Sequence, residues 1–124
     1  MRHLFFILFI FGVLACAQDE KQDLHLFEVE VQVYHHGTAV PHCTVYLMEY
    51  AQDFPGDDLS QYHFEVTSDE MGKATIKDVL AGEHWIYGLG FDGVDTVKGN
   101  MSIYIDPQDV DRYAKFILQV SEKH

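Results

Sequence analysis

Histidine is the residue type in this sequence with the clearest potential for chemistry. His35, His36 and His42 flank one predicted turn, and imidazole is a common ligand of copper and zinc. Met48 or Cys43 would add a soft sulfur ligand nearby. The spacing matches no recognised metal motif, and adjacent residues at the end of a strand point to opposite sides. A Cu or Zn site at His35, His36 and His42 is therefore the alternative interpretation of this chain.

Two groups of aspartates are candidates for calcium binding through their oxygens. Asp53, Asp57 and Asp58 form one group, and Asp92 and Asp95 form the other. Neither group has the alternating aspartates and glycine of a calcium-binding loop. Aspartate also favours turns, because its carboxylate accepts hydrogen bonds from the nearby backbone. We therefore expect turns here, and no cofactor beyond a lipid on the N-terminus.

Tyrosines supply a second kind of candidate binding residue. Tyr34, Tyr46, Tyr50 and Tyr104 are predicted on the outer faces of strands. A tyrosine ring offers flat apolar area with a polar tip, which suits the stacking of sugars or contact with a protein. The alternative is that these rings cover the core of the second sheet.

The motifs of common enzymes are absent from the sequence. There is no nucleophile elbow, no HExxH and no phosphate-binding loop, so we expect no enzymatic activity. The formal net charge is −12, and the few lysines and arginines form no cluster. Nucleic acid binding needs concentrated positive charge, so nucleic acid is excluded as a partner.

The elements that must position these residues are predicted to be strands. Apolar and polar residues alternate with a period of two, as in Val29, Val31 and Val33 between Glu28 and Glu30. Seven short strands at near-regular spacing predict an all-β, Greek-key sandwich of the transthyretin-like or immunoglobulin-like kind. The predicted strands are residues 24–34, 43–50, 62–67, 74–80, 84–91, 101–106 and 114–120.

The fifth predicted strand carries the largest aromatic load, and we place its aromatic face at the centre of the core. That face consists of Trp85, Tyr87, Leu89 and Phe91. Gly88 and Gly90 then lie on the other face, where they indicate a bulge or a close backbone neighbour. Residues 51–61 form the longest loop, residues 92–99 form a hairpin loop, and one helical turn is expected in 107–113.

The first residues of the chain predict its location. Residues 1–15 read as a signal peptide, because the apolar run is too short to span a bilayer. Val-Leu-Ala before Cys16 resembles the lipobox of bacterial lipoproteins, which implies a lipidated Cys16 and a polar tether over 16–23. No aspartate follows Cys16 directly, so the usual signal for retention in the inner membrane is missing and we expect an outer-membrane anchor. Asp19 and Glu20 resemble an export tag of surface lipoproteins, which favours the cell surface. Cys43 is then unpaired, and we expect it to be buried.

The pattern of turns in 24–124 resembles the carboxypeptidase regulatory-like domain. The resemblance rests on Gly37 with Val40-Pro41, on Thr67-x-Asp69-x-x-Gly72, and on Gly82 before Trp85-Ile86-Tyr87, where this chain has one extra residue. It implies a transthyretin-like sandwich that serves as an accessory module or a stand-alone surface protein.

These observations together favour a lipid-anchored cell-envelope module without enzymatic activity. We expect it to bind a partner protein or a glycan, as an accessory subunit of an outer-membrane assembly. The competing hypothesis is a periplasmic or surface lipoprotein that binds Cu or Zn through its histidine-rich turn.

Overall fold

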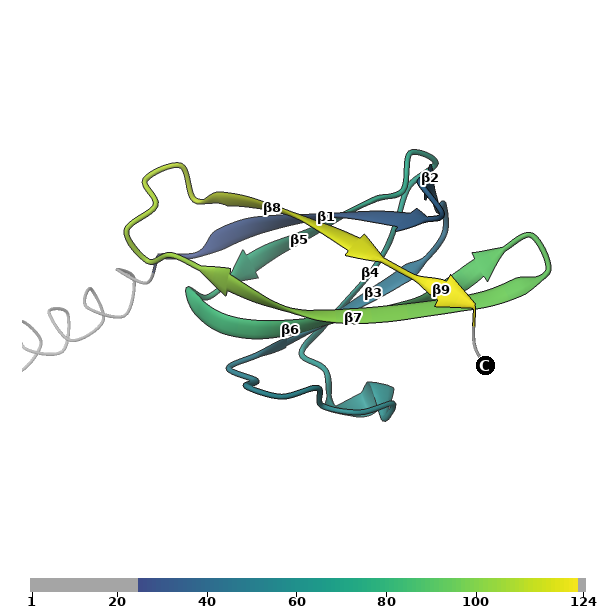
Figure 1. Cartoon of the computed structure of the whole chain (residues 1–124). Helices are drawn as coiled ribbons and strands as arrows, with labels where there is room; N and C mark the ends of the chain where they lie inside the picture. Colours follow the sequence, from purple (N-terminus) through teal and green to yellow (C-terminus); the bar gives the residue numbers. More distant parts are fainter. Residues whose placement is uncertain (1–24, 123–124) are drawn as a thin grey trace, which may run out of the picture.

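The computed structural model describes residues 25–122, which form two β-sheets packed face to face (Figure 1). The first sheet is built around β1 (Phe27–His35). It pairs antiparallel with β5 (Lys73–Val79) and with the short β2 (Thr38–Ala39), and parallel with β8 (Tyr113–Gln119). This parallel pair brings the first and the last long strands of the chain together in one layer.

The second sheet has the order β4-β3-β6-β7-β9, with every pair antiparallel. Its strands are β3 (Thr44–Glu49), β4 (Phe64–Thr67), β6 (Gly82–Asp92), β7 (Asp95–Ile105) and β9 (Ser121–Glu122). The chain crosses between the sheets before β3, before β5, before β6, before β8 and before β9. Two of the nine strands have only two residues, so seven longer strands remain, and the predicted all-β sandwich is confirmed.

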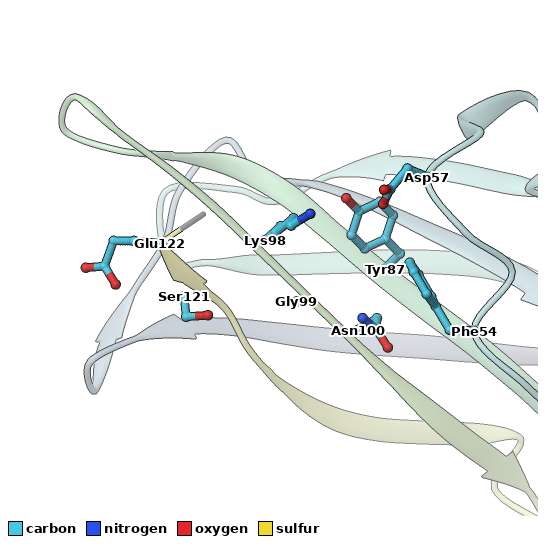
Figure 2. A pocket seen from close by; sticks show the side chains of 8 residues that line it. All are labelled: Phe54, Asp57, Tyr87, Lys98, Gly99, Asn100, Ser121 and Glu122. Atoms are coloured by element: carbon cyan, nitrogen blue, oxygen red, sulfur yellow. The ribbon is translucent and has the colours of Figure 1, made fainter. Parts of the chain in front are cut away.

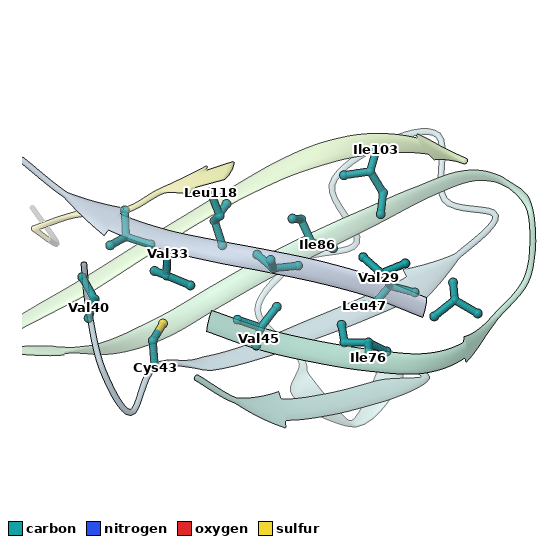
Figure 3. Close-up of a cluster of buried hydrophobic side chains, with 14 of the residues drawn as sticks. Val29, Val33, Val40, Cys43, Val45, Leu47, Ile76, Ile86, Ile103 and Leu118 are labelled. Atoms are coloured by element: carbon teal, nitrogen blue, oxygen red, sulfur yellow. The ribbon is translucent and has the colours of Figure 1, made fainter. Parts of the chain in front are cut away.

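The core lies between the sheets because each long strand turns one apolar face inward. β1 alternates buried and half-buried residues along its whole length, as its sequence predicts. Val33, Val40 and Cys43 gather at one end of the core and Ile76 and Ile103 at the other (Figure 3). The burial of Cys43 is confirmed, and it raises the pKa of the thiol to about 11.

The orientation predicted for the 84–91 strand is wrong. Its core face is formed by the other set of residues, with His84 and Ile86 fully buried between the sheets, and Phe91 is 65% exposed. The two glycines explain the arrangement, because their neighbours occupy the space of a side chain. A Cβ on Gly88 would lie 2.7 Å from Leu118 Cδ2, and one on Gly90 would lie 3.0 Å from Cys43 Cα.

The 92–99 hairpin loop is much shorter than predicted. β6 and β7 stay paired up to Asp92 and Asp95, and only Gly93 and Val94 form the turn. Gly93 has a φ of +66°, the left-handed conformation that a two-residue hairpin requires. The helical turn expected in 107–113 is also absent, and the one helix of the described residues is the 3-10 turn η2 (Leu59–Gln61).

The predicted turn at 69–72 is present with the expected glycine. Gly72 has a φ of +79°, and Asp69 Oδ1 accepts hydrogen bonds from the backbone N–H of Met71 at 2.8 Å and of Lys73 at 3.0 Å. The predicted signal peptide, the lipidated Cys16 and the tether lie outside the described residues. Within 25–122, no helix is both long and apolar enough to cross a membrane.

Candidate functional site

The segment between β3 and β4 covers an aromatic cluster on the outer face of the second sheet. Figure 1 shows this segment on the side of β6 that faces away from the first sheet. Tyr46 and Tyr87 are register partners in β3 and β6, with ring centroids 6.3 Å apart. Tyr62 lies 5.7 Å from Tyr46, and Phe54 lies 5.5 Å from Tyr87 in an edge-to-face arrangement. The sandwich thus has a second, smaller apolar layer outside its main core.

Hydrogen bonds hold this covering segment in place. Tyr62 donates its hydroxyl to the carbonyl of Gly56 at 2.9 Å, and Asp58 caps η2 by accepting from Ser60 N at 3.2 Å. At the end of the segment, the backbone N–H of His63 donates to the carbonyl of Leu47 at 3.0 Å. Phe54 is therefore fixed beside the sheet, with 39% of its surface exposed.

A groove of about 300 Å³ runs along the outer face from this cluster to the end of β9. Figure 2 shows Phe54, Tyr87 and Asp57 at one end of the groove, Ser121 and Glu122 at the other, and Lys98 and Asn100 between them. Gly99 also contributes to the lining. Aromatic, ammonium, amide and carboxylate groups thus converge on one recess, as in sites for small polar ligands.

The polar groups of the groove are held in defined states. Trp85 Nε1 donates a hydrogen bond of 3.0 Å to Asn100 Oδ1, which leaves the amide N–H groups of Asn100 available to a ligand. Burial raises the pKa of Tyr87 to about 12, with a further contribution from the Asp57 carboxylate. Tyr87 is therefore a neutral hydroxyl at physiological pH, and the residue is 3% exposed.

A second cluster of polar side chains lies where β1 ends. His35 continues the inward series of β1 and is 5% exposed. Its Nδ1 lies 2.7 Å from Asp92 Oδ2 and its Nε2 lies 2.9 Å from Glu122 Oε1, while His36 Nε2 lies 3.1 Å from the same Glu122 oxygen. The hydrogen bond with Asp92 raises the pKa of His35, against an opposing effect of burial, and Glu122 raises it further.

Of the three predicted metal-binding histidines, the structure brings two together and places the third, His42, outside their cluster. His35 and His36 come together with ring centroids 4.1 Å apart, because His36 has a φ of +51° and does not continue the strand. Within 25–122, the one group of three or more histidine, cysteine and carboxylate residues with ligand atoms within 4.8 Å of one another contains Glu122 and not His42. Cys43 lies in the hydrophobic core.

The aspartates considered as calcium ligands do not gather into such a group within the described part of the chain. Asp58 caps η2, Asp57 lines the groove, and Asp92 holds His35. Asp92 and Asp95 face each other as the last pair of the β6–β7 hairpin.

The predicted binding tyrosines lie in four separate places. Tyr34 is half-buried on the first sheet, and Tyr46 lies on the outer face of the second sheet but is covered by the aromatic cluster. Tyr50 is 64% exposed at the end of β3, and Tyr104 is 63% exposed on β7, opposite Glu83. The structure brings none of these four into the lining of the groove.

Apart from Asp57, sequence reasoning misses the residues that line the groove. Alternation places Tyr87 in the core, and it gives Phe54, Lys98 and Asn100 no role in binding. Gly88 and Gly90 could have indicated the correct orientation. When one face of a strand carries two glycines and the other carries bulky aromatic residues, the glycine face is the one that another strand can approach closely.

Comparisons with known proteins support the fold. No protein-family model matches the chain, and no curated protein matches it significantly. The solved structures that are similar include a DUF3823 family protein from Parabacteroides merdae ATCC 43184, with a TM-score of 0.55 and 14% identity over 81% of this chain and 48% of that one.

A second similar structure is catechol 1,2-dioxygenase from Acinetobacter sp. ADP1, inhibited by bound mercury. Its TM-score is 0.51, with 11% identity over 82% of this chain and 54% of that one. This chain therefore spans about half the length of each of these structures. At such identities the likeness shows a shared β-sandwich fold and no shared activity.

Proposed function

We propose that this chain is a lipid-anchored, non-enzymatic module of the bacterial cell envelope that binds a glycan on the outer face of its second sheet. The groove of about 300 Å³ between Phe54 and Glu122 is the observation that carries the proposal. Its volume lies at the lower end of the range for small-molecule sites and is sufficient for a short stretch of sugar.

The residue types in the groove match the surface of a sugar ring. A pyranose has apolar C–H faces and a rim of hydroxyl groups, so a complementary site needs a flat ring beside hydrogen-bonding groups. Phe54 presents a partly exposed ring, and Asn100 and Lys98 supply donors. Asp57 supplies an acceptor at one end, and the hydroxyl group of Ser121 lies at the other (Figure 2).

Glycan binding can be tested with the full-length lipoprotein in mild detergent. A glycan array identifies ligands, and titration is then followed by the fluorescence of Trp85, which is the one tryptophan of the chain and hydrogen bonds to Asn100. Loss of one ring or amide contact is expected to weaken Kd about threefold to tenfold in Phe54→Ala and Asn100→Ala. Tyr104→Ala is the matched control, an exposed aromatic on the same sheet outside the groove.

A partner protein is the competing ligand, and the same variants separate the two. Protein interfaces are broader than this groove and would extend over the exposed Phe91 and Tyr104. If no glycan binds and a stoichiometric membrane protein co-purifies, with capture lost in Tyr104→Ala but retained in Phe54→Ala, the glycan proposal is wrong.

The anchor and the location form a separate part of the proposal. The lipobox-like sequence before Cys16 supports an acylated mature N-terminus, and the following acidic pair supports export to the outer membrane. Mass spectrometry of the purified protein is expected to find an acylated Cys16. Protease treatment of intact cells is expected to digest the domain, and full protection would place it on the periplasmic side instead.

A further inference from the structure

The cluster of His35, His36 and Glu122 adjoins the groove, because Glu122 also lines the end of the groove. Its ligands come from both sheets. The two histidines end β1 in the first sheet, while Glu122 belongs to β9 in the second. Asp92, which holds His35, ends β6 in the second sheet.

The hydrogen bonds of the cluster leave acceptor atoms facing one another. In its neutral form, with Nδ1–H donated to Asp92, His35 presents the lone pair of Nε2 toward Glu122. This Nε2 atom is buried and has no hydrogen-bond partner, although the Glu122 oxygen is 2.9 Å away. A buried imidazole nitrogen that faces a carboxylate needs a positive charge between the two, and either a proton on Nε2 or a metal ion supplies it.

The distances from the Glu122 oxygen to the two histidine nitrogens suit a transition metal. Zn²⁺ binds imidazole nitrogen and carboxylate oxygen at roughly 2.0–2.2 Å, so two ligands of one ion lie about 2.9 Å apart at a right angle and about 3.3 Å apart at a tetrahedral angle. The two separations from Glu122 Oε1 are 2.9 Å, to His35 Nε2, and 3.1 Å, to His36 Nε2. Each of the three residues offers a ligand atom within 4.8 Å of those of the other two.

The carboxylate behind His35 is the usual companion of a metal-binding imidazole. Asp92 Oδ2 lies 2.7 Å from His35 Nδ1, which fixes the ring and its tautomer and makes the other nitrogen a better ligand. The formal charge of −12 favours the approach of a cation.

We propose that His35 Nε2, His36 Nε2 and a Glu122 carboxylate oxygen bind one Zn²⁺ or Cu²⁺ ion, with Asp92 as the positioning residue behind His35. Water completes the coordination shell, because His36 is exposed to solvent. The ion ties the end of the first sheet to the last strand of the second. This site differs from the metal site considered in the sequence analysis, because Glu122 takes the place of His42.

Isothermal titration of the tag-free full-length protein with ZnCl2 and CuCl2 tests the site. We expect one ion per chain with a Kd of micromolar or tighter, and a higher Tm in the presence of the metal because the ion binds only the folded chain. Glu122→Gln and His36→Asn are expected to weaken Kd at least tenfold. Asp92→Asn is expected to weaken it by about 10- to 100-fold, with Asp95→Asn as its control.

His42→Asn is the matched control for His36→Asn. Both histidines are exposed and both have left-handed backbones, with φ of +51° at His36 and +58° at His42, and asparagine tolerates that conformation. Circular dichroism and the urea midpoint verify that each variant is folded. No binding tighter than micromolar, or equal weakening in His42→Asn and His36→Asn, overturns the proposal. Glycan binding is measured without added metal, and His36 does not line the groove, so the two proposals can fail separately.

Discussion

Substitution of Gly88 tests the orientation of β6 directly. In the structure this glycine faces the core, where a Cβ would lie 2.7 Å from Leu118 Cδ2. Carbon atoms pack at about 3.5–4.0 Å, so Gly88→Ala displaces the end of the Leu118 side chain by roughly 1 Å. Overpacking of this kind costs about 1–3 kcal/mol of unfolding free energy, and replacement of a strand glycine returns about 0.5–1 kcal/mol. We therefore expect Gly88→Ala to destabilise the protein by about 1–2 kcal/mol.

A double-mutant cycle makes the test specific to this contact. Leu118 is 1% exposed, so Leu118→Ala alone is expected to cost about 2–5 kcal/mol. In the double variant the methyl group added at position 88 enters the space that the Leu118 side chain vacated. The combined loss should therefore be smaller than the sum of the two single losses by about 1 kcal/mol or more.

Urea unfolding followed by Trp85 fluorescence and by circular dichroism measures these free energies. Ser102→Ala, on the exposed side of the neighbouring strand, is the control and should stay within about 0.5 kcal/mol of the parent. If Gly88→Ala is neutral or stabilising and its effect adds to that of Leu118→Ala, then Gly88 does not face the core and the described register is refuted.

Three further predictions follow from buried or hydrogen-bonded groups. In a Cys16→Ser background, Cys43 should react with a thiol reagent at pH 8 only after unfolding, because the thiol is buried and its pKa is raised to about 11. Fast reaction of the native protein would contradict the burial of Cys43. Asp69→Ala should lower the free energy of unfolding in urea by about 1 kcal/mol, because two backbone N–H groups of the turn lose their acceptor. Glu70 is exposed in the same turn, so Glu70→Ala should be neutral, and equal effects of the two substitutions would contradict the hydrogen bonds of Asp69. Tyr87 has a pKa of about 12 in the folded chain, whereas a tyrosine in the unfolded chain ionises near pH 10. The contribution of Tyr87 to the free energy of unfolding is therefore complete below pH 10 and is lost as the pH rises to 12. The fall in stability between pH 9 and 11 should be smaller in Tyr87→Phe, and an unchanged fall would refute the raised pKa.

The difficulty of assigning faces from the sequence is clearest in β6. Both of its faces contain apolar residues, so alternation alone does not say which face is inside. Trp85 and Tyr87 have the larger side chains, and their size favours the core. They lie instead on the outer face, where the segment that contains Phe54 and Tyr62 covers part of the surface, and the glycines leave room inside for the opposite sheet.

The sequence by itself determined the seven longer strands of this protein, though not all of their ends, and the positions of several turns. Alternation with a period of two is a local property, as is the need for a left-handed residue at Gly72, so both can be read from neighbouring residues. The tertiary structure alone decided the two candidate sites. Glu122 reaches His36 across 86 positions of the chain because β9 leaves the first sheet and pairs with β7 in the second, and the groove forms because a connecting segment folds back over β3 and β6. Contacts of this kind depend on how distant strands pair, and no local pattern of residues records them.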